Sequence, residues 1–372
     1  MAKLIKLSQL LGQADLKPQF RFTIGFDGFV DEIIEVVDQR FSSFSYTRIK
    51  TIAELGDRIS RSTNLSTNIE LVPRIVKLGG NGPIMANALC ATDQLVSYVG
   101  NLGMPQIHPV FNQLVNSCQQ VISIGEPAHT DALEFNDGKI MLGKLEPLTN
   151  ITWESLVAAA GESKLKTLFT EVDLVAMVNW TMIPNMNQLW IKLLEFLADI
   201  PMIKQPYLFI DLADPEKRSR TDKAEALELI AGMERYYKVI LGLNRKEATE
   251  LAQVLDLDLS ASPEQVPITE ITTQLAAKLN LWCVVVHAVD QAAAVQDGNL
   301  AHVPGPYTPN PVLTTGAGDN FNAGFCLGIL MGLSLENALL LAKASSGFYV
   351  RNGYSPTFEQ LKGFISYWAE LL

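Results

Sequence analysis

Short segments that are apolar throughout recur along this chain, and longer segments with helical periodicity separate them. Two clear examples are Leu-Val-Ala-Met-Val-Asn at 174–179 and Cys-Val-Val-Val-His-Ala-Val at 283–289. A strand without polar alternation suits a sheet that is covered on both faces, and strand–helix alternation is typical of parallel strands. The sequence therefore predicts an α/β fold with a mostly parallel central sheet.

This alternation predicts the individual elements. Strands are expected at 21–26, 96–100, 121–125, 174–179, 208–212, 239–243 and 282–286. Helices are expected at 84–92, 106–117, 152–170, 185–198, 222–236, 245–255, 263–279, 317–332, 335–350 and 358–371. Thr357 and Gln360 have the spacing of a capping box, and Ser334 precedes another helical segment. Because no internal repeat or low-complexity linker divides the chain, we expect one domain over residues 1–372.

Two segments interrupt this rhythm. Residues 30–75 are polar, poorly periodic and rich in Ser, Thr and Asn, while residues 130–143 place Asn136-Asp137-Gly138 between two short apolar runs. The second pattern is a good hairpin signal. We expect the two insertions to form a small β element that projects from the core. Two ordinary surface loops would explain the composition about equally well.

Charge and composition exclude several classes of protein. Among 372 residues, 40 are acidic and 29 basic, which gives a net charge of −11. This balance argues against nucleic-acid binding but leaves an anionic small ligand open, because a few oriented N–H groups can hold a phosphate. The four cysteines are scattered and form no metal-ligand cluster with histidine. No apolar run of roughly 18 residues occurs, so we expect no membrane span and a cytoplasmic location.

The strongest motif is Thr-Thr-Gly-Ala-Gly-Asp at 314–319, which leads into an apolar helical segment. Small residues let a ligand approach the backbone closely, and the first N–H groups of the following helix can bind an anion. The carboxylate of Asp319 could then accept a proton from a hydroxyl that attacks a phosphoryl group. The alternative is that Asp319 only caps the helix, and before other observations the two interpretations are about even.

Two weaker motifs suggest a site for a polyol. Gly79-Gly80-Asn81 allows close approach of the backbone, and the Asn81 side chain offers both a donor and an acceptor. Asp27 and Asp31 follow the first predicted strand, where carboxylates can accept hydrogen bonds from sugar hydroxyls. Taken alone, each motif is better explained as an ordinary turn.

Two further motifs suggest phosphate or metal binding. Asn244 and Glu247 lie three residues apart after a strand, so both face one side of the first helical turn and could hold hydrated Mg²⁺. A capping box explains the same pair equally well. Lys217 and Arg218 follow the strand at 208–212 and could pair with phosphate, although a solvated basic turn is as good an explanation.

Together, in this order along the chain, the motifs resemble those of the ribokinase-like (PfkB-type) carbohydrate kinases. The resemblance covers nearly the whole chain, and Thr-Thr-Gly-Ala-Gly-Asp-x-Phe at 314–321 is its most specific part. It implies a three-layer α/β/α core and a small β-sheet lid over the sugar, with lid strands in 30–75 and 130–143. It also implies transfer of the γ-phosphoryl group of ATP to a hydroxyl of a small carbohydrate.

The resemblance also implies residue roles. Asp319 matches the general base of the family. The anion hole is matched by Gly316, Ala317 and Gly318, with Thr315 beside the phosphates. The sugar-binding positions are matched by Asp31, Gly79, Gly80 and Asn81, to which we add Asp27. Asn244 and Glu247 match the pair that organises Mg²⁺ and phosphate water, with Glu247 reaching the metal through water.

The chain departs from the family in three places. Leu313 replaces an aspartate that helps to hold a monovalent cation in many members. The segment at 286–291 differs from the usual glycine-containing loop that borders the nucleotide. The sugar turn reads Gly-Gly-Asn-Gly-Pro-Ile-Met-Ala-Asn, so Asn87 is either the displaced sugar-binding asparagine or an ordinary helix residue. These departures concern the monovalent-cation site, the nucleotide contacts and the sugar pocket.

We therefore predict an ATP-dependent sugar kinase that uses Mg²⁺. One alternative is a nucleoside or vitamin-alcohol kinase of the same fold, and another is a catalytically silent sugar- or nucleotide-binding protein. A Rossmann dehydrogenase is disfavoured because Gly316-x-Gly318 lacks a third glycine at residue 321, and no Walker-type motif is present. The resemblance also suggests a homodimer through the lid. The motifs identify neither the sugar nor the hydroxyl.

Overall fold

The computed structural model describes residues 1–13, 19–262 and 265–371. Its large sheet has the strand order β14-β13-β12-β11-β10-β9-β1-β5-β6. The bounds are β1 (Arg21–Phe26), β5 (Leu95–Gly100), β6 (Gln120–Ser123), β9 (Leu174–Val178), β10 (Tyr207–Asp211), β11 (Lys238–Asn244), β12 (Cys283–His287), β13 (Gln291–Gln296) and β14 (Asn299–Pro304). Neighbouring strands from β6 to β12 run parallel, and β13 and β14 add an antiparallel edge. The predicted α/β class is confirmed.

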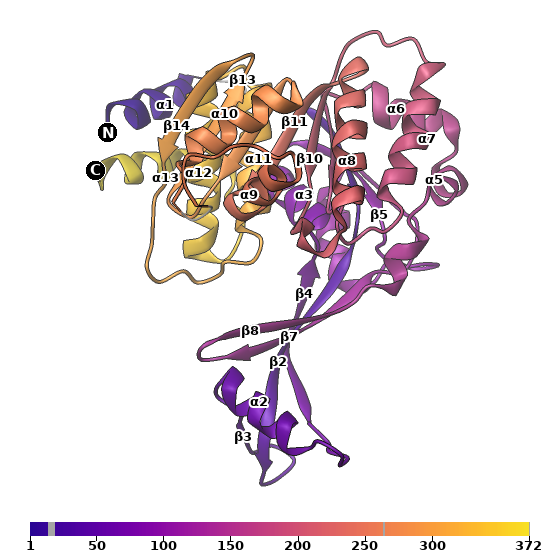
Figure 1. Ribbon diagram of the computed structural model, residues 1–372, viewed down its shortest axis with the longest axis vertical. Coiled ribbons are helices and arrows are strands. Elements are labelled where there is room, and N and C mark those ends of the chain that lie inside the picture. The colour runs from indigo at the N-terminus through magenta and orange to yellow at the C-terminus, as the bar shows by residue number, and fades with distance from the viewer. Residues whose placement is uncertain (14–18, 263–264, 372) are drawn as a thin grey trace.

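Helices cover both faces of this sheet (Figure 1). The longer helices are α1 (Ala2–Gln13), α3 (Asn81–Ala91), α5 (Trp153–Ala160), α6 (Glu162–Thr170), α7 (Met186–Ala198), α8 (Arg220–Gly232), α9 (Arg245–Val254), α10 (Ile268–Leu279), α11 (Ala317–Leu330), α12 (Leu335–Asn352) and α13 (Phe358–Glu370). Alternate residues of β9 belong to different cores: Val175 and Met177 pack with α5 to α10, whereas Leu174 and Ala176 pack with α1, α3 and α11 to α13. The two cores give the three layers that the motifs imply.

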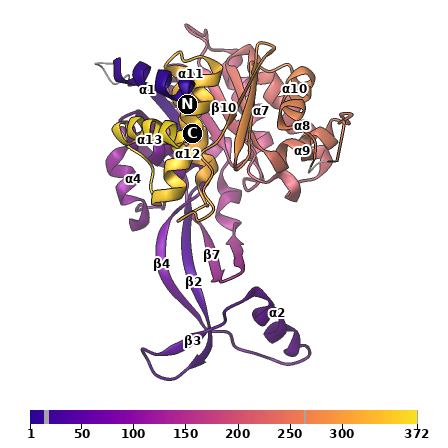
Figure 2. The same ribbon diagram turned by 90° about the vertical axis from the view of Figure 1, so that its left-hand side faces the viewer.

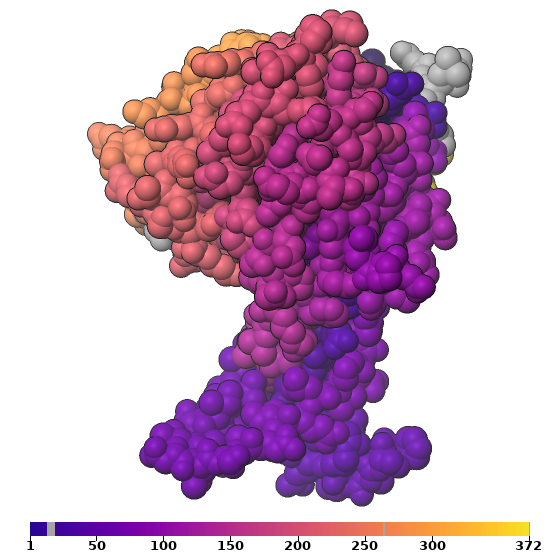
Figure 3. Space-filling model, turned by 90° about the vertical axis from the view of Figure 1, so that its right-hand side faces the viewer, coloured from indigo at the N-terminus to yellow at the C-terminus, as the bar shows by residue number. Residues whose placement is uncertain are grey.

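A second, smaller sheet projects from the core beside α3 (Figures 1 and 2). It contains β2 (Phe29–Arg40), β3 (Tyr46–Arg48), β4 (Leu71–Gly79), β7 (Ala128–Phe135) and β8 (Gly138–Lys144), with α2 (Ile52–Arg61) near its tip. Figure 3 shows it below the broad core, with a narrow connection to the core and a wider lower end. Ile34, Leu55 and Phe135 belong to its own small apolar cluster. The predicted β element is therefore present, while the division of the chain into domains stays a prediction.

Several predicted boundaries are wrong for local reasons. The helix expected at 152–170 is two helices, because Gly161 between them adopts a φ of 74° that ends the first. The helix expected at 106–117 begins as a 3₁₀ turn at Pro109–Phe111 and continues as α4 (Asn112–Ser117). The helix expected at 263–279 begins at Ile268, and residues 263–264 lie outside the described residues.

Helix α1, helix α2 and the β13–β14 hairpin are absent from the prediction. Helix α1 packs on α13, although the sequence suggested only a terminus with two lysines. The β13–β14 hairpin turns at Asp297-Gly298, and three of the four central residues of β13 are alanine, which is a poor strand former by itself. Over the described ranges, no helix is both long and apolar enough to cross a membrane. The cytoplasmic location stays a prediction.

Candidate active site

The polar motifs meet outside the carboxyl ends of the parallel strands. From β1 the chain passes to β5 and β6 on one side and then returns to β9 on the other, so the strand order reverses at β1. Ligands of open α/β sheets bind at such a reversal. Asp27 follows β1, Asn179 follows β9, and Asp211 and Asn244 end β10 and β11. The fold thus brings together residues that are far apart in sequence.

Helix α11 begins without a side-chain cap. Gly316 precedes it with a φ of 93°, and a Cβ atom there would lie 2.7 Å from the Tyr349 hydroxyl, so only glycine fits. The Tyr349 hydroxyl donates a hydrogen bond of 2.8 Å to the Thr315 carbonyl and holds the preceding loop. The Ala317 N–H makes a turn bond of 3.1 Å to the Thr314 carbonyl. This start of α11 presents backbone donors and the positive end of the helix dipole.

Asp319 lies in the first turn of α11 and is only 6% exposed. The Asn81 amide donates to its Oδ1 at 3.0 Å, across 238 positions of sequence. Burial raises the pKa of Asp319 well above its usual range, the Asp211 and Asp27 charges raise it further, and the Asn81 bond opposes them. A buried carboxylate with a raised pKa is a stronger proton acceptor than one in water.

Asp27 is fully buried, and its oxygens face the start of α3. It accepts hydrogen bonds from the Asn81 N–H at 3.0 Å, the Gly82 N–H at 2.9 Å and the Asn179 amide at 2.6 Å. Burial raises its pKa to about 6 in spite of these bonds. The contacts favour a role in fixing the Gly80–Asn81 turn, and direct contact between Asp27 and substrate stays a prediction.

Asp31 lies in β2 of the small sheet and is 6% exposed. Its neighbours across the sheet are Lys77 on β4 and Thr130 on β7. Burial raises the pKa of Asp31, while the Lys77 charge and a hydrogen bond from Thr130 lower it. A Cβ atom at Gly79 would lie 2.3 Å from the Asp31 carboxyl group, so this position requires glycine.

Tyr349 connects the two halves of the site. Burial raises the pKa of its phenol, and the charges of both Asp319 and Asp31 raise it further. Gly79 lies against Asp31 and Asn81 donates to Asp319, so both carboxylates lie beside the turn at 79–81. A bound polyol between them would have a carboxylate near each end.

A second acidic group lies beside β10 and α9. Asn244 and Glu247 form a capping box, in which the Glu247 N–H donates to Asn244 Oδ1 at 3.0 Å and the Asn244 N–H donates to Glu247 Oε2 at 2.8 Å. The Asp214 N–H donates to the other Glu247 oxygen at 2.9 Å, and Asp211 accepts from the Asn322 amide at 2.7 Å. The capping explanation is thus correct, and phosphate-side binding by this pair stays a prediction.

This acidic group fits a divalent cation nearby. Burial raises the pKa of both Asp211 and Glu247, and the Asp211 charge raises that of Glu247 further. The buried oxygens Asn320 Oδ1 and Asn322 Oδ1 have no protein partner. Buried negative charge and unused oxygens suit Mg²⁺ with its water shell, which prefers oxygen ligands.

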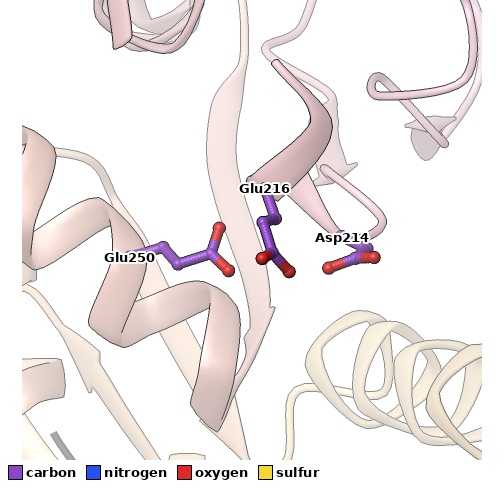
Figure 4. Close-up of side chains that lie close together, drawn as sticks. All are labelled: Asp214, Glu216 and Glu250. Carbon is purple, nitrogen blue, oxygen red and sulfur yellow. The ribbon is translucent and has the colours of Figure 1, made fainter. Parts of the chain in front are cut away.

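A different acidic cluster contains Asp214, Glu216 and Glu250 (Figure 4). The Lys246 ammonium lies within it, 2.8 Å from Asp214 and 2.5 Å from Glu216. This lysine already neutralises part of the charge, and its own pKa is raised by hydrogen bonds to Asp214 and Glu216. The cluster is therefore explained as a surface ion-pair network.

The Arg218 guanidinium is held by backbone carbonyls and by the Trp180 ring. Its Nη2 lies 3.2 Å from the Ile183 carbonyl and 3.4 Å from the Pro184 carbonyl, and its guanidinium stacks 4.5 Å from the centre of the Trp180 ring. Lys217 is exposed and lies 3.8 Å from the Met182 sulfur. These contacts give neither side chain a position beside Asp319.

A cavity of about 440 Å³ opens beside the start of α11. Thr314, Ala317 and Gly318 lie at one end, and Asn244 comes from β11. The other lining residues are Arg245, Lys246, His287, Ala288, Val289, Pro306, Tyr307, Thr308, Pro311, Phe321, Lys343, Ser346, Gly347 and Val350. The lining is mainly apolar, and part of it comes from the unusual loop at 286–291.

Sequence reasoning missed four site residues. Asn179, Asp211 and Asn322 contribute to the buried polar network, and Tyr349 holds the start of α11. Asn179 and Asp211 carried a usable signal, because each is a polar residue at the end of an apolar strand. Asn322 was the one polar residue in an apolar segment. Tyr349 carried no such signal, since it lies among ordinary residues of an amphipathic helix.

Comparisons with known proteins agree with this geometry. The sequence model of a family described as prokaryotic ketohexokinase matches residues 14–368. A ketohexokinase from Haloferax volcanii is 29% identical over 352 residues, which cover 93% of this chain and 91% of that protein. An inositol 3-kinase from Oryza sativa subsp. japonica is 36% identical over 115 residues, covering 30% of this chain and 28% of that protein.

Solved structures share the fold at low identity. A carbohydrate kinase from Agrobacterium tumefaciens has a TM-score of 0.63 at 13% identity and covers 94% of this chain and 97% of its own. A ribokinase from Cryptococcus neoformans var. grubii serotype A, in complex with ADP, has a TM-score of 0.61 at 16% identity and covers 93% of this chain and 98% of its own. At these identities the likeness concerns the fold.

Proposed function

This chain belongs to the prokaryotic ketohexokinase family and is an ATP-dependent sugar kinase, and we propose that the sugar it phosphorylates is a ketohexose. The observation that carries the proposal is the family match over residues 14–368, which spans the core, the small sheet and every motif described above. A phosphotransferase of this kind transfers the γ-phosphoryl group of ATP to a sugar hydroxyl: a bond forms between the sugar oxygen and the γ-phosphorus, the bond from the γ-phosphorus to the β,γ-bridging oxygen breaks, and ADP leaves.

Asp319 is the general base of the proposed mechanism. The sugar lies between Asp31 on one side and the hydrogen-bonded pair of Asn81 and Asp319 on the other, and Gly79 and Gly80 allow it to approach the backbone. As the hydroxyl oxygen attacks phosphorus, its proton passes to the Asp319 carboxylate, whose raised pKa favours that transfer. The backbone donors at Gly316–Gly318 stabilise the charge on the transferred group.

ATP occupies the cavity beside α11, with its phosphates toward Thr315 and the start of the helix. Asn244 and Glu247 lie on the phosphate side, and Glu247 would hold Mg²⁺ through water. Mg²⁺ supplies charge neutralisation of the phosphate oxygens when it is bound. The small sheet acts as the lid that excludes water from the sugar, and it also offers the surface for a homodimer.

The experiment is a coupled assay of ATP consumption with Mg²⁺ over ketohexoses, aldohexoses, sugar phosphates, inositol and nucleosides. A ketohexose with the highest kcat/KM, together with a kcat that falls about 10²- to 10⁴-fold in Asp319→Asn, supports the proposal. If inositol or a nucleoside has a higher kcat/KM than every ketohexose, that compound is the acceptor and the proposed ketohexose is wrong. The fold assignment is unchanged by this result. Binding of ATP or sugar without any turnover would favour the alternative of a catalytically silent sugar- or nucleotide-binding protein.

A further inference from the structure

Two of the four cysteines contact each other through space. The sulfur atoms of Cys90 and Cys118 lie 3.8 Å apart, although 28 positions of sequence separate the two residues. Cys90 is in the last turn of α3, and Cys118 is the residue that follows α4. The two helices pack against each other. The fold therefore makes a pair of thiols from two cysteines that form no motif in the sequence.

Both thiols of this pair are partly exposed. They lie at the margin of the core that α1, α3 and α11 to α13 share, and pack on its buried side chains. Cys118 leads into β6, which is an edge strand of the large sheet. A small oxidant dissolved in water can reach a pair in this position.

The other two cysteines serve as an internal comparison. Cys283 in β12 and Cys326 in α11 are both fully buried. Burial raises the pKa of the Cys326 thiol, and the charge of Cys283 raises it further, so these two thiols are also neighbours. A buried thiol that keeps its proton is inert. Exposure, and not only proximity, therefore distinguishes Cys90 and Cys118.

Little rearrangement is needed to join the two exposed sulfurs. An S–S bond is about 2.05 Å long, so the atoms have to approach by roughly 1.8 Å. Cys118 has an extended backbone, with φ −75° and ψ 149°, and its side chain is free of the rotamer limits of a helix. Rotation about its Cα–Cβ bond moves the sulfur while the backbones of α3 and α4 stay in place.

The contact also decides which sulfur reacts first. The hydrogen bond with Cys90 and burial both raise the pKa of the Cys118 thiol. Cys118 therefore keeps its proton and donates it toward the Cys90 sulfur. Because the thiolate is the reactive form and a donated hydrogen bond favours a thiolate, Cys90 is the sulfur that attacks an oxidant. Cys118 then has the position of a resolving cysteine.

We propose that Cys90 and Cys118 are a redox modification site, which hydrogen peroxide converts into an intramolecular disulfide. The Cys90 thiolate attacks one peroxide oxygen, an S–O bond forms, the O–O bond breaks, and the released hydroxide takes up a proton to become water. The Cys118 sulfur then attacks the Cys90 sulfur, the S–S bond forms, the S–O bond breaks, and the hydroxyl leaves with the Cys118 proton as a second water. The two thiols lose two electrons, and the peroxide gains them.

The disulfide ties the end of α3 to the end of α4. The loop that it closes, residues 90–118, contains β5, which pairs with both β1 and β6. A cross-link of this kind restricts the unfolded chain, so the oxidised protein is the more stable form. The inference depends neither on the sugar nor on turnover, so its failure would leave the proposed function untouched, and the reverse is also true.

The test is a peptide map of the ligand-free wild-type protein after treatment with hydrogen peroxide at about pH 8, where more of a thiol is ionised. Free thiols are blocked with iodoacetamide under denaturing conditions before digestion. We expect the peptide with Cys90 to be joined to the peptide with Cys118, and Cys283 and Cys326 to be alkylated. The melting temperature should rise by about 3–6 °C and return to its first value with dithiothreitol.

Variants test the order of the two steps. Cys118→Ser should accumulate a sulfenic acid at Cys90, which dimedone traps, because the resolving thiol is missing. Cys90→Ser should give neither a cross-link nor a sulfenic acid at Cys118. Cys326→Ala, which removes a buried thiol, is the matched control and should form the cross-link like the wild type.

A map with Cys90 and Cys118 both alkylated, or with Cys90 oxidised to sulfinic acid and no cross-link, would overturn the inference. So would disulfides that join two molecules only, or oxidation of Cys283 and Cys326 to the same extent, since that pattern indicates an unfolded chain. A cross-linked protein whose melting temperature does not rise would overturn the stabilising effect. If a variant does not fold, the wild-type map decides alone.

Discussion

At the scale of single residues, the site contains carboxylates of different character. Asp319 and Asp31 lie beside the turn at 79–81, whereas both oxygens of Asp27 already accept hydrogen bonds, from the Asn81 and Gly82 N–H groups and from Asn179. The difference is geometric, because each residue has the same functional group. Only a group with an unused oxygen facing the ligand can take part in chemistry.

Replacing Asp319 by asparagine should remove the proton acceptor and keep the shape. We expect kcat to fall about 10²- to 10⁴-fold, the usual contribution of a general base, with little change in the melting temperature. Asp256→Asn, which alters an 80%-exposed carboxylate, is the matched control and should keep full activity. Turnover within a few-fold of the wild type would show that Asp319 is not the base. The measurement is steady-state kinetics.

At the scale of elements, glycines set how closely the small sheet and the helix starts approach the ligand. Gly79 ends β4 directly against Asp31, and Gly316 lies against the Tyr349 hydroxyl. Local sequence signals work well here, because a glycine-rich turn before a helix has the same geometry in any fold. The caps at Ser334, Thr357 and Asn244 are confirmed for the same reason.

Gly79→Ala should displace the Asp31 carboxyl group, because the new Cβ atom would lie 2.3 Å from it. We expect at least a tenfold rise in KM for the sugar and little change in KM for ATP. Gly56→Ala is the control, since Gly56 lies in α2 of the same sheet region with nothing within 4 Å. That variant should be more stable by roughly 0.5–1 kcal/mol. An unchanged sugar KM in Gly79→Ala would contradict the role of Asp31.

Glu247→Gln should separate capping from metal binding. The glutamine still accepts through one oxygen, so the cap is weakened by only about 1 kcal/mol. We expect the Mg²⁺ concentration for half-maximal activity to rise severalfold, because a buried negative charge is lost. Titration of activity with Mg²⁺ measures this, and complete chelation of the metal should abolish turnover in both proteins. A lower melting temperature with an unchanged Mg²⁺ requirement would leave capping as the only role.

At the scale of the whole molecule, the fold gathers buried acidic groups from distant segments into one region. Asp27, Asp211, Glu247 and Asp319 follow or begin different elements, and burial raises the pKa of each. Such a concentration of charge destabilises the ligand-free protein and stabilises the protein with cation and nucleotide. The site is therefore maintained by packing elsewhere in the two cores.

The pH dependence of stability should reveal this. The folded protein holds a proton on Asp27 up to about pH 6, whereas an unfolded carboxyl releases it near its ordinary value of 3.8. Because the folded state binds more protons in this window, raising the pH through it lowers the free energy of unfolding. For Asp27 alone the loss is roughly 2–3 kcal/mol, at about 1.4 kcal/mol per pKa unit.

Urea unfolding of the ligand-free protein at several pH values between 4 and 7 measures the effect. In Asp27→Asn the part of the pH dependence of the unfolding free energy that comes from Asp27 should be absent. In Asp256→Asn it should be present. If the free energy of unfolding depends on pH equally in the wild type and in Asp27→Asn, the Asp27 carboxyl is not the source of that dependence. The remaining slope of Asp27→Asn comes from the other carboxyl groups whose pKa burial raises, among them Asp211, Glu247 and Asp319.

The amino-acid sequence by itself determined the α/β class, the projecting β element and the position of each glycine-rich turn. These depend on short-range pattern: apolar runs, helical periodicity and backbone geometry at small residues. It missed the β13–β14 hairpin, because alanine-rich segments have no strand preference and become strands through burial against the sheet.

Only the tertiary structure decided which groups face one another. The Asn81–Asp319 contact, the enclosure of Asp27, the Lys246 counter-charge and the position of Lys343 in the cavity all join segments that are distant in sequence. The burial of a side chain and the electrostatic potential at it depend on all the residues that surround it in the folded protein. No local pattern contains them, because they arise only when the chain is packed.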